Sequence, residues 1–231
     1  MPLRFPPILL FVALASAALF EHHLQCPTAR GAVVSIGSGN ALSATSSASA
    51  TGHSPSDIEL VLAHSPFDSY YVCGEHHQGE LPYLGDDLGT DCMVSKLVTV
   101  DDRTWARTYE GDGLKNEQWF SWRATLLAPC ECEVVKIHLN PVENEPGKLG
   151  QPPASSIVFK RSDGVHILYA HIQEPAVAVG DKVAYGQPVA KVGNNGYGRN
   201  PHVHVGAWRD GKAIQLRWDL ANTESAANIS E

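Results

Sequence analysis

The sequence is poor in positive charge, has no convincing amphipathic helix in its folded part and has no Cys-x-x-Cys pair, and each of these absences argues against a class of protein. Lys and Arg number 17 against 25 Asp and Glu, and the net charge of -8 argues against non-specific binding to nucleic acid or anionic lipid. No Cys-x-x-Cys pair occurs, which argues against a zinc site built from thiolates. No convincing amphipathic helix follows residue 58, so the folded part is not expected to be helical.

The N-terminal region has the composition of an export signal followed by a linker. Arg4 supplies a short basic segment, residues 8–20 are apolar, and Ala15-Ser16-Ala17 is similar to a signal-peptidase site. We therefore expect residues 1–18 to be a signal peptide, or an N-terminal anchor if uncleaved. Cleavage would leave an exported protein, periplasmic or extracellular, without stable membrane insertion. A flexible Ser/Ala/Gly/Thr-rich linker at 19–56, one domain at 57–220 and a polar tail at 221–231 complete the expected organisation.

The five cysteines form an odd set, so at least one of them is free or pairs with another molecule. Export would place them in an oxidising compartment, where disulfides form. A bond between Cys73 and Cys92 would close the loop that holds a pair of histidines. The sequence leaves the connectivity open, including that of Cys130 and Cys132.

Short hydrophobic runs separated by turn signals predict an all-β fold with long loops. The loop at 140–153 is expected to join two strands as a hairpin, and the aromatic-rich stretch 101–122 is expected to be an irregular insertion or one wall of a groove. The predicted strands are Ile58–Ala63, Lys96–Val100, Ala124–Ala128, Glu133–His138, Ser156–Phe159, His166–His171, Lys182–Val183, Pro188–Val192 and His202–Trp208.

The most informative segment is Pro201-His202-Val203-His204-Val205. Side chains two positions apart on a strand point to the same face, so His202 and His204 would lie side by side. Two adjacent imidazoles supply half of a zinc site, whereas the alternative interpretation is a pair of surface histidines on an edge strand.

Other metal-ligating residue types occur upstream. His76 and His77 lie in a Gly-rich segment, and Asp91 stands just before an apolar run, where a poor β-former is unusual. A charge at the rim of a core is usually paired or bound to metal. His171 follows a strand of alternating character and completes the set of candidates.

Residues 165–205 resemble the zinc endopeptidases of the lysostaphin/LytM type, which cut the peptide part of bacterial peptidoglycan. Five segments follow in the same order as in that family, and the similarity continues upstream through 126–129 and 133–135. The five segments are Tyr169-Ala170-His171, Val179-Gly180-Asp181-Lys182-Val183, Gly186-Gln187-Pro188-Val189, Val192-Gly193-Asn194-Asn195-Gly196 and Pro201-His202-Val203-His204-Val205.

The resemblance implies a compact antiparallel β domain of the duplicated hybrid motif, or barrel-sandwich, type that holds one Zn²⁺. The family motif His-x-Gly-x-Asp is split here, because a loop separates His77-Gln78-Gly79 from Gly89-Thr90-Asp91. By position, the implied metal ligands are His77, Asp91 and His204, the implied catalytic residues are His171, His202 and Tyr71, and the alternatives are His76 for His77, Asp86 or Asp87 for Asp91, and Tyr70 for Tyr71.

The implied function is zinc-dependent hydrolysis of peptide bonds in peptidoglycan by a metal-activated water. The alternative is a catalytically degenerate relative that binds or regulates a cell-wall amidase. Residues 177–192 are also similar to biotinyl and lipoyl carrier domains, but Lys182 and Lys191 lack the sequence context of a carrier lysine. The expected partners are therefore peptidoglycan peptides or an amidase, with no nucleic acid.

Overall fold

The structure is a computed structural model that describes residues 58–221. The expected signal peptide and linker, Cys26 and the tail beyond residue 221 lie outside the described residues. Within the described part, no helix is long and apolar enough to span a membrane.

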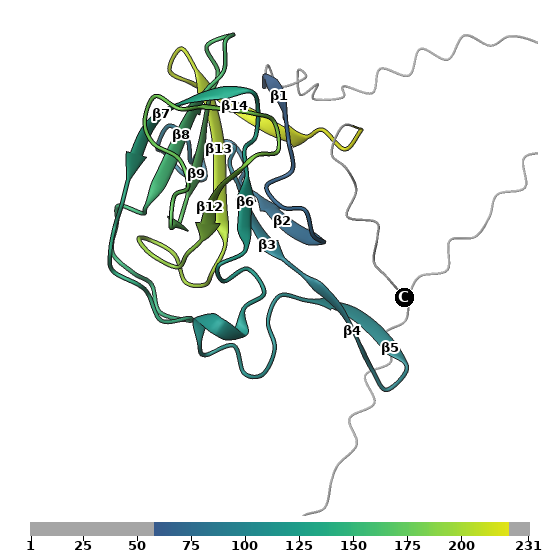
Figure 1. The fold of residues 1–231 in the computed structure, drawn as a ribbon. Coiled ribbons are helices and arrows are strands. Elements are labelled where there is room, and N and C mark those ends of the chain that lie inside the picture. Colours follow the sequence, from purple (N-terminus) through teal and green to yellow (C-terminus); the bar gives the residue numbers. More distant parts are fainter. Residues whose placement is uncertain (1–57, 222–231) are drawn as a thin grey trace, which may run out of the picture. The chain divides into compact units, whose positions relative to one another are not determined.

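Residues 58–221 form fourteen β-strands and one 3₁₀ helix, so the all-β class is confirmed (Figure 1). The elements are β1 (Leu60–Ala63), β2 (Tyr71–Glu75), β3 (Thr90–Val94), β4 (Lys96–Val100), β5 (Arg103–Arg107), η1 (Asn116–Gln118), β6 (Thr125–Leu127), β7 (Cys132–His138), β8 (Ser156–Lys160), β9 (His166–Ala170), β10 (Ile172–Gln173), β11 (Lys182–Val183), β12 (Pro188–Val192), β13 (Val203–Arg209) and β14 (Lys212–Trp218).

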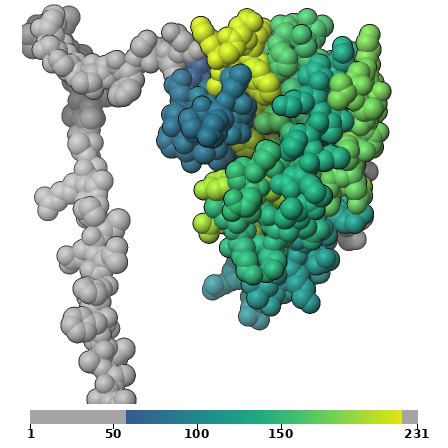
Figure 2. Space-filling model, turned by 90° about the vertical axis from the view of Figure 1, so that its left-hand side faces the viewer, coloured from purple at the N-terminus to yellow at the C-terminus, as the bar shows by residue number. Residues whose placement is uncertain are grey.

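Nine of the strands make up one large sheet, whose main path runs β1-β14-β13-β9-β8-β7-β11. Strand β3 also pairs with β13, and β2 pairs with β3. All these pairs are antiparallel except β1 with β14, which is parallel. The first and last described strands therefore lie side by side, and Figure 2 shows their segments meeting at the surface.

A smaller sheet, β10-β12-β6, shares its buried side chains with the large sheet. Strand β9 alternates from His166 to Tyr169 as expected for a strand that packs one face, with Ile167 and Tyr169 fully buried and His166 and Leu168 half-buried. The buried hydroxyl of Tyr169 donates to the carbonyl of Leu127 in β6 at 3.0 Å. This bond satisfies the one polar atom of the ring and ties the two sheets together.

All nine strands predicted from hydrophobic runs are confirmed, and the loop at 140–153 joins the antiparallel pair β7 and β8 as expected. Five further strands were not predicted: β2, β3, β5, β10 and β14. The region 101–122 is only partly irregular, because residues 103–107 pair with β4 to form a separate two-stranded sheet. Strands β2 and β3 were missed because Gly74, Glu75 and Asp91 interrupt their hydrophobic pattern.

Two disulfides join four of the cysteines. Cys73 and Cys92 face each other across β2 and β3 with Cα atoms 4.1 Å apart, which confirms the pairing considered from the sequence. Cys130 bonds to Cys132 just before and at the start of β7. The first bond closes a long loop and the second a very short one, with sequence separations of 19 and 2.

We predict that the double variant Cys73→Ala/Cys92→Ala lowers the free energy of unfolding by about 3 kcal/mol, the chain-entropy value for a loop of this length. The matched variant Cys130→Ala/Cys132→Ala should lose about half as much, because its loop is far shorter. Urea titrations followed by tryptophan fluorescence measure both losses. An equal or larger loss in the Cys130/Cys132 variant would contradict the prediction.

Candidate metal centre

Four strands of the large sheet bring the candidate residues to one place. Asp91 on β3 lies directly opposite His204 on β13, and Ala170 at the end of β9 lies opposite the same histidine. His76 follows β2 by one residue, and its backbone N–H donates to the carbonyl of Gly89 at 2.8 Å, which continues the β2–β3 pairing.

His76, Asp91 and His204 offer three ligand atoms that all lie within 4.8 Å of one another. Nδ1 of His204 is 2.8 Å from Oδ1 of Asp91, and Nε2 of His76 is 3.4 Å from Oδ2. Ligand atoms of a tetrahedral zinc site lie about 3.4 Å apart, given metal–ligand distances of about 2.0–2.1 Å. Nε2 of His76 is buried without a hydrogen-bond partner. A buried polar atom is normally paired, so a bound cation would explain this unpaired nitrogen. The residues present therefore fit a divalent metal.

The positive charge of His204 and the negative charge of Asp91 stabilise each other. Burial alone would lower the pKa of His204, but its contacts with Asp86 and Asp91 outweigh burial and raise the pKa to about 10. Burial would raise the pKa of Asp91, but the hydrogen bond from His204 and the nearby histidine charges hold that pKa well below its usual range. Without a metal, a proton is therefore held between His204 and Asp91, in the position that a cation would take.

His171 and His202 form a second pair beside this group. Their ring centroids are 4.4 Å apart, and Nε2 of His202 lies 3.7 Å from Oδ1 of Asp91. Each Nδ1 lies 2.7 Å from a backbone carbonyl, that of Asn195 for His171 and that of Asn200 for His202. Because a carbonyl only accepts, Nδ1 carries the proton in both rings and each neutral Nε2 keeps a free lone pair.

Burial sets the protonation state of this second pair. It lowers the pKa of His171 to about 3, and it also lowers the pKa of His202. Both side chains are therefore neutral near pH 7. His171 also has a backbone φ of 61°, an unusual left-handed conformation for a non-glycine residue, at the break between β9 and β10. Such strain concentrates at functional sites.

A side-chain amide fixes the loop that holds His171. Asn195 accepts a hydrogen bond from the backbone N–H of Ser155 at 2.7 Å and donates to the carbonyl of Ile172 at 2.9 Å. The loop must also pass close to both rings, because a Cβ atom on Gly198 would lie 3.2 Å from Cε1 of His171 and of His202. The position of Asn195 and the absence of a side chain at Gly198 thus define one wall of the site.

Two of the residues assigned from the resemblance do not lie in this group. His77 points to solvent with 81% of its side chain exposed and contacts Glu80, whereas His76 is 17% exposed and faces Asp91. The structure therefore places His76, the alternative to His77, beside Asp91 and His204. The reason is that neighbouring residues of an extended chain point to opposite sides, so only one histidine of the pair can face the site.

Tyr71 is also placed elsewhere. It pairs with Val94, three positions along the strand from the Gly74–Asp91 pair, a distance of about 10 Å at the rise of a strand. Its ring packs against Phe67 and Trp218, so it belongs to the core, and its position does not fit an oxyanion role. Tyr70 precedes β2 and is exposed.

Asp86 and Asp87 do not replace Asp91. Asp86 contacts the far nitrogen of His204, Nε2, at 3.3 Å, and Asp87 accepts the backbone N–H of Gly79. Sequence reasoning missed Asn195, Gly85 and Glu80 as neighbours of the site. Only the Asn195 position carried a signal, since it lies in one of the matching segments.

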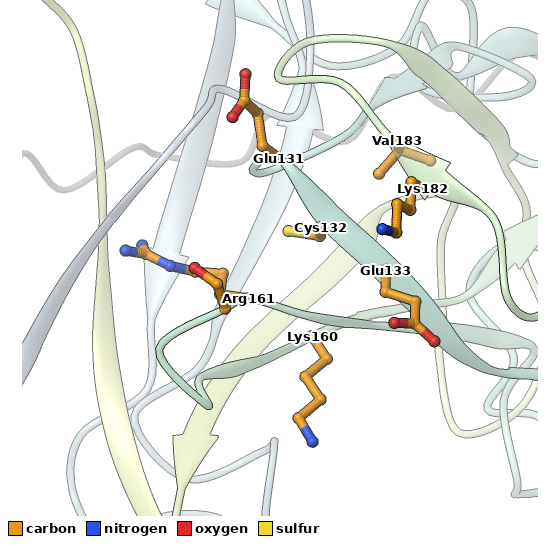
Figure 3. A pocket seen from close by; sticks show the side chains of 8 residues that line it. Glu131, Cys132, Glu133, Lys160, Arg161, Lys182 and Val183 are labelled. Carbon is orange, nitrogen blue, oxygen red and sulfur yellow. The ribbon is translucent and has the colours of Figure 1, made fainter.

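A pocket lies at the opposite end of β8 from this site (Figure 3). The metal-site end of β8 is Ser156, which pairs with Ala170, while the pocket adjoins Lys160. Its walls mix cationic and acidic side chains and include none of the site histidines. The lining residues are Glu131, Cys132, Glu133, Lys160, Arg161, Ser162, Lys182 and Val183.

The fold and site together define an all-β domain in which a His/Asp/His group able to hold a metal ion lies beside two neutral histidines. Residues 126–216 match the model of peptidase family M23, so the resemblance to this family is confirmed over that segment. The match contains His171, His202 and His204, and it begins after His76 and Asp91. A comparison with curated proteins gave no match.

Solved structures that match the chain include two peptidase domains and a chain of the SpoIIIAH–SpoIIQ complex. The catalytic domain of the prophage-encoded M23 protein EnpA from Enterococcus faecalis is 17% identical, with 73% of this chain and 98% of that chain covered and a TM-score of 0.41. The lysostaphin catalytic domain from Staphylococcus simulans is 18% identical, with 62% and 83% covered and a TM-score of 0.37. A chain of the SpoIIIAH–SpoIIQ complex is 22% identical, with 66% and 95% covered and a TM-score of 0.40. Because these TM-scores are below 0.5, the resemblance to the M23 family rests on the sequence match over 126–216.

We predict that Asn195→Ala lowers the free energy of unfolding by roughly 2–4 kcal/mol, because it removes two buried hydrogen bonds of the side chain. Asn200→Ala is the matched control. The backbone carbonyl of Asn200 accepts from Nδ1 of His202, and the substitution leaves this carbonyl in place. Its loss should stay within about 0.5 kcal/mol. Thermal and urea unfolding measure both values, and equal losses would contradict the bracing role of the Asn195 side chain.

Proposed function

We propose that this protein is a zinc-dependent endopeptidase that hydrolyses peptide bonds in peptidoglycan. The observation that carries the proposal is the grouping of His76, Asp91 and His204 around one point, beside two neutral histidines with free Nε2 atoms. The family match over 126–216 supports the reaction class. The choice of peptidoglycan peptides as substrate rests on the resemblance to the lysostaphin/LytM type, and the proposed exported location rests on the signal-like residues 1–18.

Zinc would be held by Nε2 of His76, a carboxylate oxygen of Asp91 and Nδ1 of His204, and catalytic zinc sites with three protein ligands generally also bind a water or the substrate. Bound zinc would supply Lewis acidity, which polarises a carbonyl group and makes water a nucleophile near neutral pH. Its one carboxylate ligand leaves the site with a net positive charge, and this favours the developing oxyanion of an amide hydrolysis.

His171 and His202 supply the proton-handling groups of the proposed reaction. Each keeps Nε2 unprotonated because Nδ1–H is held by a carbonyl, so Nε2 accepts a proton from the attacking water and returns it to the leaving amine. Nε2 of His202 is the nearer of the two to Asp91, at 3.7 Å from Oδ1. We assign His202 to the proton transfer and His171 to positioning the His202 ring, which it contacts with ring centroids 4.4 Å apart.

We predict that the purified protein binds one zinc per chain and that His76→Ala and His204→Ala lose both zinc and hydrolysis of defined peptidoglycan fragments. His77→Ala should keep a stoichiometry of one zinc, because it leaves the three ligand atoms in place. Metal analysis after dialysis gives the stoichiometry, and product analysis by mass spectrometry gives the cleavage.

The pair His76→Ala and His77→Ala tests the ligand assignment directly, since the two positions are adjacent and carry the same side chain. Zinc loss in His77→Ala alone would contradict the assignment of His76. Absence of zinc from the wild-type protein, or full hydrolysis by His204→Ala, would contradict the proposed function. Stimulation of an amidase without cleavage of any amide bond would favour the regulatory alternative.

A further inference from the structure

The loop between His77 and Leu88, which splits the family motif, lies against the proposed metal ligands. Its backbone packs on β13 so closely that a Cβ atom on Gly206 would lie 1.6 Å from the carbonyl oxygen of Gly85. Gly89, where the loop returns to β3, is equally close to the site, since a Cβ atom there would lie 2.8 Å from Cε1 of His204. The loop is therefore a part of the site wall.

The loop holds the far nitrogen of His204. Nε2 of His204 lies 3.1 Å from the carbonyl oxygen of Gly85 and 3.3 Å from Oδ1 of Asp86, while Nδ1 faces Asp91. Because the Gly85 carbonyl only accepts, Nε2 of His204 carries a proton. A cation bound through Nδ1 would replace the proton that Nδ1 shares with Asp91, and the loop would still hold Nε2–H. Asp86 and Asp91 lie on different sides of the His204 ring, Asp86 near Nε2 and Asp91 near Nδ1. Asp86 therefore orients the ring, and a cation held by Nδ1 and Asp91 would lie on the other side of it.

The loop also holds the far nitrogen of His76. Oε2 of Glu80 lies 3.5 Å from Nδ1 of His76, opposite the unpartnered Nε2. Glu80 is itself fixed, because Oε2 accepts the backbone N–H of His77 at 3.1 Å and lies 2.9 Å from Nδ1 of His77. Both proposed histidine ligands thus meet a loop carboxylate on the side away from the metal position.

We propose that the loop residues Glu80, Gly85 and Asp86 form a clasp that orients His76 and His204 for metal binding. The inference rests on the proposed function, since it names positioning residues for the same zinc. Carboxylates and carbonyls that accept the second N–H of a ligating histidine fix its tautomer and raise its basicity. The inserted loop thereby supplies from one segment the outer partners of two ligands that stand on different strands.

The test measures zinc affinity of the full chain by competition with a chromophoric chelator. Asp86→Ala and Glu80→Ala should each raise the dissociation constant by about 10–100-fold, the usual effect of losing an outer-shell partner. Asp86→Asn should lose less, because its amide oxygen still accepts from Nε2–H. Asp87→Asn is the matched control: it removes one charge from the same loop but keeps an oxygen for the N–H of Gly79, and its constant should change less than about 3-fold.

A spectroscopic measurement separates positioning from a general loss of structure. In ¹⁵N-labelled zinc-loaded protein, the imidazole proton of His204 should reside on Nε2 and should exchange with water faster in Asp86→Ala than in Asp87→Asn. The thermal unfolding of the metal-free variants should match that of the wild type. Zinc binding by the wild type with unchanged affinity in Asp86→Ala and Glu80→Ala would overturn the clasp alone, whereas no zinc binding by the wild type would overturn the proposed function as well.

Discussion

The pairing of β3 with β13 is the constraint on which the site depends. It places Asp91 directly opposite His204, with Cys92 opposite Val203 and Thr90 opposite Val205. A slip of one residue would turn every side chain of β3 to the other face, and Asp91 would then enter the core. The register is protected because Cys92 and Val94 are buried on the face away from Asp91 and because Cys92 is bonded to Cys73 on β2. Core packing and a covalent bond therefore set the position of a polar residue.

The same register determines which histidine reaches the site. Gly74 on β2 pairs with Asp91, and the pairing continues to His76 through the carbonyl of Gly89. Alternation along an extended chain then directs His76 inward and His77 outward. The family pattern alone favoured His77, because the spacing to Gly79 copies the motif. The sequence could not decide between His76 and His77. The choice depends on which residues of β2 face the site, and the hydrophobic pattern of the sequence did not reveal β2.

Local signals explain what could be predicted. His202 and His204 share a face because the period of a strand is two, and the runs of Val and Ile around them and in β8, β9 and β12 mark buried strands without knowledge of their partners. Tyr71 illustrates the limit. It is near His77 in sequence, yet β2 carries it toward Phe67 and Trp218, and Trp218 lies at the other end of the domain sequence. Non-local packing, which a local pattern does not contain, decides its role.

The division of labour among the four site histidines follows from the groups that meet their second nitrogens. His76 and His204 face carboxylates of the inserted loop as well as Asp91, so negative charge surrounds the position that a cation would take. His171 and His202 direct Nδ1 to backbone carbonyls and are buried, and for His202 burial outweighs the charge of Asp91, so both stay neutral. A carbonyl fixes a tautomer without stabilising a second proton as strongly as a carboxylate does. Residues of one chemical type thus acquire two functions within one cluster, and the positions of three acidic side chains make the difference.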